Sequence, residues 1–165
     1  MPDLVLTIPS KGRIFGETFN LLRLNKKLEV FVYVDELEHA AYREAYPGYN
    51  IIPHRYNTIS EIRYFMQEHQ CRLNNNQLIL DDDVKYFTDL YGYVQPLDCV
   101  LDMVRNALND FNYVSFYIER SIPSAKFLSP AEGAITFTPN LYKNNVRYDK
   151  NMLSEDFAFG RDCNY

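Results

Sequence analysis

Cysteine is scarce in this chain of 165 residues, and Cys71, Cys99 and Cys163 show no CxxC spacing. This excludes a recognisable zinc motif and a disulfide framework, and it predicts reduced thiols in a cytoplasmic protein. The chain also lacks a long hydrophobic run, and its start, Met1-Pro2-Asp3, is acidic rather than basic. We therefore expect neither a membrane span nor a signal peptide.

An excess of positive charge is absent too. The chain has 17 basic and 22 acidic residues, which gives a net charge of -5. Such a surface does not attract polyanions through bulk charge, so affinity for nucleic acid requires a local basic patch. The first expected loop has neither the GxGxxG nor the Walker pattern, so its backbone amides alone are not expected to grip a diphosphate.

Apolar residues make up 47% of the chain and aromatic residues 15%, which predicts one domain with a real core. Apolar, β-favouring runs predict strands in the first half at 4–8, 30–34, 50–52 and 77–80. Helices are expected between these strands, at 17–27, at 37–46 and after a capping-box sequence at Thr58–Glu61. This alternation predicts an α/β fold with a mostly parallel sheet covered by helices.

The second half is less regular. Its apolar spacing predicts a helix over 100–111, and β-favouring runs predict strands at 113–118 and 134–137. We expect the last strand to be antiparallel and nearer an edge of the sheet. Two prolines and a glycine predict a loop over 121–133.

Three adjacent acids, Asp81, Asp82 and Asp83, follow the apolar run 78–80. Adjacent carboxylates repel one another, so their position after a buried strand implies a divalent cation, a basic partner or a surface screened by water. Ligands of open α/β sheets sit beyond the carboxyl ends of the strands, which favours the cation over a solvated turn.

Two further expected strand ends carry polar groups. The stretch Ser10–Arg13 is short and basic, and the pair Asp35-Glu36 is acidic. A cation on the aspartates would neutralise phosphates that the basic loop cannot hold alone, so the features support each other. The alternative for Lys11 and Arg13 is a solvated turn.

On these residues the chain resembles the GT-A glycosyltransferases. The run 78–84 is similar to their DxD motif, 6–13 to their first-strand loop, and 153–159 to the acidic segment near their acceptor. A narrower resemblance is to the phage-type glycosyltransferases associated with TET/JBP oxygenases, which are proposed to modify hydroxymethylated bases in DNA. The resemblance implies a three-layer GT-A domain over 1–165, with a nucleotide-sugar-binding half at 1–84 and an acceptor-side half at 85–165.

The resemblance also implies a nucleotide-diphosphate sugar donor and an Mn²⁺ or Mg²⁺ cofactor. Asp83 and Asp81 would hold the cation, and Asp81 is alternatively a ribose contact. Asp35 would hold uracil or ribose, and Arg13 and Arg63 would steady the diphosphate or the base. The full set of implied donor contacts is Thr7, Pro9, Ser10, Lys11, Arg13, Asp35, Arg63, Asp81 and Asp82.

Glu155 and Asp156 would face the acceptor hydroxyl, and in an inverting enzyme one of them would be the general base. In a retaining enzyme the acid only positions the acceptor, and the sequence leaves this open. The pair also fits a helix N-terminus behind Ser154. The chain departs from the family in one respect, because His39, His54 and His69 all precede the DxD segment. We therefore expect these histidines at the surface and a cation held mainly by Asp83 and substrate oxygens.

Other classes of protein stay open. The run Asp81–Val84 satisfies the DxDx(T/V) pattern of haloacid-dehalogenase-type phosphatases, with Asp81 as nucleophile, although that motif normally follows a first strand. A nucleotidyltransferase and a GT-A domain that binds nucleotide without turnover are further alternatives. Basic residues at 126, 143, 147 and 150 are compatible with DNA as the acceptor.

Overall fold

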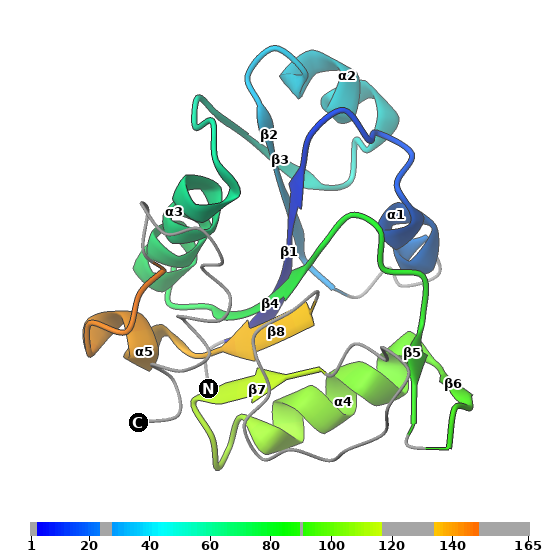
Figure 1. The fold of residues 1–165 in the computed structure, drawn as a ribbon, viewed down its shortest axis with the longest axis vertical. Coiled ribbons are helices and arrows are strands. Elements are labelled where there is room, and N and C mark those ends of the chain that lie inside the picture. Colours follow the sequence, from blue (N-terminus) through cyan, green and yellow to red (C-terminus); the bar gives the residue numbers. More distant parts are fainter. Residues whose placement is uncertain (1–2, 24–27, 90, 117–133, 149–165) are drawn as a thin grey trace.

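The computed structural model describes residues 3–23, 28–89, 91–116 and 134–148 (Figure 1). Its strands are β1 (Leu4–Ser10), β2 (Val30–Asp35), β3 (Asn50–His54), β4 (Asn76–Leu80), β5 (Phe87–Thr88), β6 (Val94–Gln95), β7 (Tyr113–Ser115) and β8 (Ala134–Phe137). Its helices are α1 (Glu17–Leu22), α2 (His39–Ala45), α3 (Ile59–Arg72), α4 (Leu97–Ala107) and α5 (Pro139–Lys143).

The described strands form a main sheet in the order β3-β2-β1-β4-β8-β7, and β5 pairs with β6 in a small second sheet. Strands β1 to β4 run parallel to one another, whereas β8 runs antiparallel to both β4 and β7. The predicted mostly parallel sheet with an antiparallel C-terminal part is therefore confirmed. The edge position belongs to β7, however, because β8 lies between β4 and β7.

Helices cover both faces of the sheet, with α3 on one side and α1 on the other (Figure 1). Leu6 and Ile8 of β1 pack with side chains of α1, α2 and α4, whereas Val5 packs with α3 and α5. Every residue of β1 and β4 is buried, which explains why their apolar runs Leu4–Leu6 and Leu78–Leu80 show no alternation with polar residues. The centre of the sheet thus excludes water from both faces, whereas β3 is partly exposed.

The start of α3 shows how local sequence fixes an element. The Thr58 hydroxyl accepts a hydrogen bond from the Glu61 backbone N–H, and the Glu61 carboxylate accepts one from the Thr58 backbone N–H. The predicted capping box is therefore confirmed, and caps of this kind contribute about 1 kcal/mol. It fixes the start of the helix that carries Arg63.

Several elements differ from the sequence predictions. The helix expected over 17–27 ends at Leu22, and 24–27 lie outside the described residues, as does the loop expected over 121–133. β5, β6 and α5 were not predicted, because elements of two to five residues are too short to show a periodicity. The surface positions expected for His54 and His69 are wrong, because His54 is buried and His69 bonds to the buried Tyr33 hydroxyl.

Within the described residues, no helix combines the length and the apolar character that crossing a membrane requires.

The loop between β1 and α1 lies against the segment that follows β4. A Cβ atom on Gly16 would overlap with the carbonyl oxygen of Asp82. Thr18 strengthens the contact, because its backbone N–H donates to the same carbonyl at 3.3 Å and its hydroxyl accepts from the Val84 N–H at 2.9 Å. The aspartate segment is therefore held at the backbone as well as at its side chains.

This close approach predicts that Gly16→Ala destabilises the protein by about 1–3 kcal/mol, because the added methyl group forces the two segments apart. Urea unfolding followed by circular dichroism measures the effect. Gly48→Ala is the matched control, since nothing lies within 4 Å of a Cβ atom at that position. Equal stability of the two variants would show that the two segments do not meet.

Candidate functional site

The sheet changes winding direction between β1 and β4. From β1 the chain proceeds outward to β2 and β3, and then returns to place β4 on the other side of β1. The pairing of β1 with β4 ends at Thr7, while its pairing with β2 continues to Ser10. In open α/β sheets, ligands bind in the crevice outside such a switch point. The loop after β1 and the aspartates after β4 flank this crevice.

Asp82 joins the two sides of the crevice. Its carboxylate accepts a hydrogen bond from the Ser10 hydroxyl at 2.9 Å and pairs with the Arg13 guanidinium at 3.0 Å. The Ser10 oxygen lies 2.8 Å from the Tyr42 hydroxyl, which donates to it because the Ser10 proton is used on Asp82. Both oxygens of the buried Asp82 carboxylate are therefore occupied by protein groups.

Asp81 has a different partner. Its carboxylate pairs at 2.8 Å with Arg63, whose side chain is only 6% exposed. Burial raises the pKa of Asp81, and the charge of Arg63 opposes that rise. Arg63 was expected to contact the donor, but in the structure its guanidinium is directed to Asp81 and holds that acid in place.

Asp83 is the open acid of the three. Its side chain is 69% exposed and lies 3.6 Å from Arg13, whose own side chain is 60% exposed. Beside them is an open cavity of about 380 Å³, bounded by the loop Gly12–Glu17 and by Asp82 and Asp83. A negatively charged ligand in this cavity meets one guanidinium and one free carboxylate.

Lys11 and Asp35 form the next part of the same edge, at 3.6 Å from each other. The Leu37 backbone N–H donates to Asp35 at 3.0 Å and, as the largest cause, lowers the pKa of Asp35, with Lys11 acting in the same direction. Gly12 adopts a positive φ of 68°, which lets its N–H donate to the Glu38 carboxylate at 2.9 Å. The loop after β1 is therefore fixed at both of these points.

The structure does not bring every expected donor contact to the edge. The Thr7 hydroxyl is fully buried and accepts a hydrogen bond from Gln77 at 2.8 Å inside the sheet. Pro9 is buried in β1, where it follows the last residue paired with β4 and so costs no ladder bond on that side. Glu155 and Asp156 lie outside the described residues. Ser10 and Arg13 do contact Asp82, Arg13 also lies near Asp83, and Lys11 pairs with Asp35.

The fit to a divalent cation follows from these contacts. In the described ranges, no three His, Cys, Asp or Glu side chains are placed to hold a metal ion together. Mg²⁺ in phosphate-handling sites is usually held by one or two carboxylates, with substrate phosphates and water as the other ligands. Asp83 supplies such a carboxylate, and Asp81 is the second candidate for this role. The residues therefore fit a cation that binds together with a phosphate ligand.

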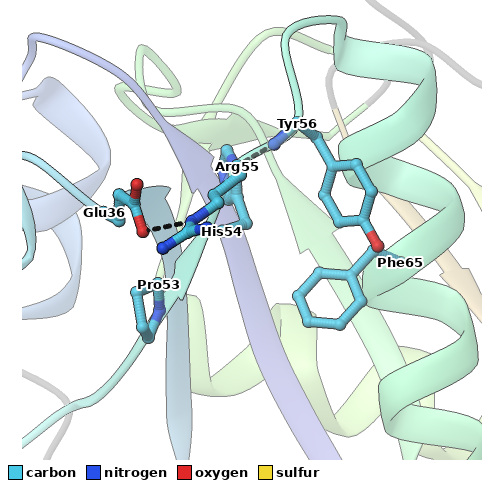
Figure 2. Close-up of a pocket in the computed structure, with 6 residues that line it drawn as sticks. All are labelled: Glu36, Pro53, His54, Arg55, Tyr56 and Phe65. Carbon is cyan, nitrogen blue, oxygen red and sulfur yellow. Dashed lines mark hydrogen bonds and ion pairs between the residues drawn. The ribbon is translucent and has the colours of Figure 1, made fainter.

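A second cavity, of about 400 Å³, lies at the ends of β2 and β3 beside α3 (Figure 2). We name it the His54 cavity; its walls are Glu36, Pro53, His54, Arg55, Tyr56 and Phe65. The register of the sheet fixes the position of His54, which is paired with Asp35 of the neighbouring strand β2. The sequence analysis missed this residue, because a single histidine after a short strand carries no distinguishing pattern.

Comparisons with known proteins identify structures with a similar fold. No family model and no curated protein matches this chain. Its structure is similar to the 4-diphosphocytidyl-2C-methyl-D-erythritol synthase of Anaerococcus prevotii DSM 20548, with a TM-score of 0.61, 11% identity, and coverage of 97% of this chain and 83% of that one. A second solved structure of 4-diphosphocytidyl-2C-methyl-D-erythritol synthase gives a TM-score of 0.59 and 11% identity, over 98% of this chain and 84% of that chain.

Similarity at this identity concerns the fold. The chain has an α/β, GT-A-like fold with a mostly parallel sheet and antiparallel C-terminal strands. The two synthase structures share this fold, and the expected GT-A-like architecture is confirmed. The division into halves at residue 84 stays a prediction.

The burial of His54 makes the stability of the protein depend on pH. Burial lowers its pKa below the ordinary 6.5 and Lys11 acts in the same direction, whereas Asp35 and Glu38 oppose the shift. As pH falls below 6.5, the unfolded chain binds a proton at this histidine before the folded one does, so stability falls until the folded-state pKa is passed.

We therefore expect wild type to lose more stability than His54→Gln between about pH 8 and about pH 5, as measured by urea unfolding. His69 has its pKa lowered by burial as well, but it is present in both proteins and cancels in the difference. Parallel pH curves for the two proteins would contradict a buried, neutral His54.

Proposed function

We propose that the protein is a divalent-metal-dependent glycosyltransferase, which moves a sugar from a nucleotide-diphosphate sugar to a hydroxyl acceptor, with a UDP-sugar as the first donor to test. The observation that carries this proposal is the meeting of Arg13 with Asp82 and Asp83 at the switch point between β1 and β4. A fold shared with nucleotide-handling transferases supports it.

The three aspartates have separate roles in this proposal. Asp82 is occupied by Ser10 and Arg13, so it orients the guanidinium rather than binding the donor itself. Asp83, with Asp81 next to it, would hold Mn²⁺ or Mg²⁺. When bound, the cation supplies positive charge to the departing nucleotide diphosphate.

Arg13 and Lys11 bind the donor from the other side of the crevice. Arg13 is exposed, anchored by Asp82 and next to Asp83, so it can pair with a diphosphate oxygen without losing its anchor. Lys11 and Asp35 lie farther along the edge, where Asp35 is an acceptor for ribose hydroxyls. The site thus has cationic groups at the phosphates and a carboxylate at the sugar of the nucleotide.

The transfer breaks the bond between the anomeric carbon of the sugar and the diphosphate oxygen, and forms a bond from that carbon to the acceptor oxygen. The hydroxyl proton passes to a carboxylate if the enzyme inverts the sugar. Glu155 and Asp156 are proposed for this role on the GT-A resemblance. Their position lies in the part of the chain that the structure does not describe.

A hydroxymethylated base in DNA is the proposed acceptor on the narrower resemblance alone. Of the basic residues noted in the sequence, Lys143 bonds to Asn74, and Arg147 lies over the Tyr142 ring at 4.2 Å. Both contacts are to protein groups, and the basic residues at 126 and 150 lie outside the described residues. Turnover of UDP-glucose with hydroxymethylated DNA, plain DNA and simple sugars identifies the acceptor.

Nucleotidyl transfer is the second candidate, and the structural similarity to 4-diphosphocytidyl-2C-methyl-D-erythritol synthase favours it. That reaction attaches a nucleotide to an acceptor phosphate and releases diphosphate from a nucleoside triphosphate. The same cationic crevice suits both reactions. The phosphatase alternative gains no support, because Asp81 is paired with Arg63 and lies after the fourth strand rather than the first.

The proposal predicts that Mn²⁺ strengthens UDP binding and that Asp83→Ala removes the gain. We expect the variant to bind UDP about tenfold or more weakly in Mn²⁺, since a contact between charged groups contributes about 1.5–3 kcal/mol. Isothermal titration calorimetry with and without Mn²⁺ measures this. Asp110→Ala, at an exposed acid beyond α4, is the control and keeps the wild-type response. An affinity for UDP that changes neither with Mn²⁺ nor with Asp83→Ala would refute the metal-bridged site.

The released product separates the two candidate reactions. Glycosyl transfer predicts the appearance of UDP from a UDP-sugar, and no release of diphosphate from CTP or UTP. Coupled assays for UDP and for inorganic diphosphate, run on the same enzyme with Mg²⁺, measure the two products. Diphosphate release with no UDP release would replace the glycosyltransferase proposal by nucleotidyl transfer.

A further inference from the structure

The His54 cavity contains a buried hydrogen-bond donor that has no partner. The Nδ1 atom of His54 accepts a hydrogen bond from the Tyr56 backbone N–H at 3.3 Å, so the neutral ring carries its proton on Nε2. That Nε2 atom is buried and makes no hydrogen bond, and His54 as a whole is only 6% exposed. A buried donor without a partner costs free energy, which a ligand with an acceptor atom in the cavity would recover.

Flat side chains line the cavity beside His54. The His54 and Tyr56 rings lie 6.0 Å apart between centroids and are tilted by 31°, and the Phe65 ring lies 5.3 Å from that of Tyr56 (Figure 2). The exposed pair of Arg55 and Glu36, at 2.6 Å, closes another side of the cavity. Its volume of about 400 Å³ is within the usual range of small-molecule sites. Aromatic walls with one donor suit a planar heterocycle with an acceptor atom.

The cavity lies on the same edge of the sheet as the diphosphate crevice. His54 is paired in register with Asp35, and Asp35 lies 3.6 Å from Lys11 of the β1 loop. From β3 to β4 the sheet order crosses three strand spacings, a distance of about 14 Å. An extended nucleoside diphosphate can therefore have its phosphates at Arg13 and its base at His54.

We propose that the His54 cavity takes the base of the bound nucleotide, and that His54 Nε2–H donates a hydrogen bond to a carbonyl oxygen of a pyrimidine base. The location of the phosphates rests on the proposed function, whereas the base contact rests on the cavity itself. Burial lowers the pKa of His54 and so keeps the ring neutral near pH 7, with Nδ1 free to accept from Tyr56. His54 is thus a residue that selects the base.

The test on wild type uses uridine, which has the base but no phosphate. Nuclear magnetic resonance of ¹⁵N-labelled protein follows the imidazole signals during titration. We expect the His54 Nε2 and its proton to shift with uridine and not with inorganic diphosphate, while the His39 signals stay unchanged. His39 lies at the start of α2, outside the cavity.

Substitutions at His54 measure how much the proposed hydrogen bond contributes to the affinity for uridine and UDP. His54→Phe keeps a flat ring but removes the donor, and we expect it to bind uridine and UDP about five- to tenfold more weakly. His54→Gln retains an amide donor at similar reach and recovers part of the affinity. His39→Phe is the matched control and binds as wild type does. Circular dichroism confirms that each variant is folded.

The outcomes separate this inference from the proposed function. Metal-dependent UDP binding with unmoved His54 signals, or with full affinity in His54→Phe, would overturn the base contact and leave the transferase proposal intact. A His54 shift with uridine but no metal-dependent UDP binding would support the base contact and overturn the diphosphate site. Binding of neither ligand would overturn both.

Discussion

One charged contact, between Arg13 and Asp82, holds the functional edge of this protein together. It connects the loop after β1 to the segment after β4, across the switch point of the sheet. Ser10 and Tyr42 extend the contact into the buried core through two hydrogen bonds. Because Asp82 is buried, the loss of Arg13 would leave its carboxylate with only the Ser10 hydroxyl as a partner, and this cost favours keeping the two segments together.

This contact also explains how three adjacent carboxylates coexist. Their mutual repulsion is relieved because each acid has a different environment: Asp81 pairs with the buried Arg63, Asp82 with Arg13, and Asp83 is exposed to water. Asp83 is the most exposed of the three acids and the one most open to a ligand. A site with one free carboxylate holds a divalent ion weakly by itself and better with phosphate oxygens, so metal and nucleotide binding are expected to depend on each other. The backbone N–H and the hydroxyl of Thr18, which bond to the backbone of this segment, keep it in this arrangement before any ligand binds.

Much of this fold could be predicted from the sequence, for reasons that particular elements make clear. β1 and β4 are buried on both faces, so they appear as apolar runs, and their parallel alternation with helices brings Arg13 and Asp82 to one edge. The partners of the acids could not be predicted, since Arg63 lies 18 residues before Asp81 and its direction depends on how α3 packs. His54 was missed for a similar reason: its environment depends on how the end of β3 packs against α3, where the Tyr56 ring lies between those of His54 and Phe65.

The central claim is that the crevice at the switch point binds a nucleotide diphosphate together with a divalent ion at Asp83. Crystals grown with UDP and Mn²⁺ and measured at the manganese absorption edge test this most directly. The account predicts one anomalous peak in coordination contact with an Asp83 oxygen and a diphosphate oxygen, with Arg13 on the same diphosphate. A diphosphate bound elsewhere on the chain, or manganese bound away from Asp83, would contradict it.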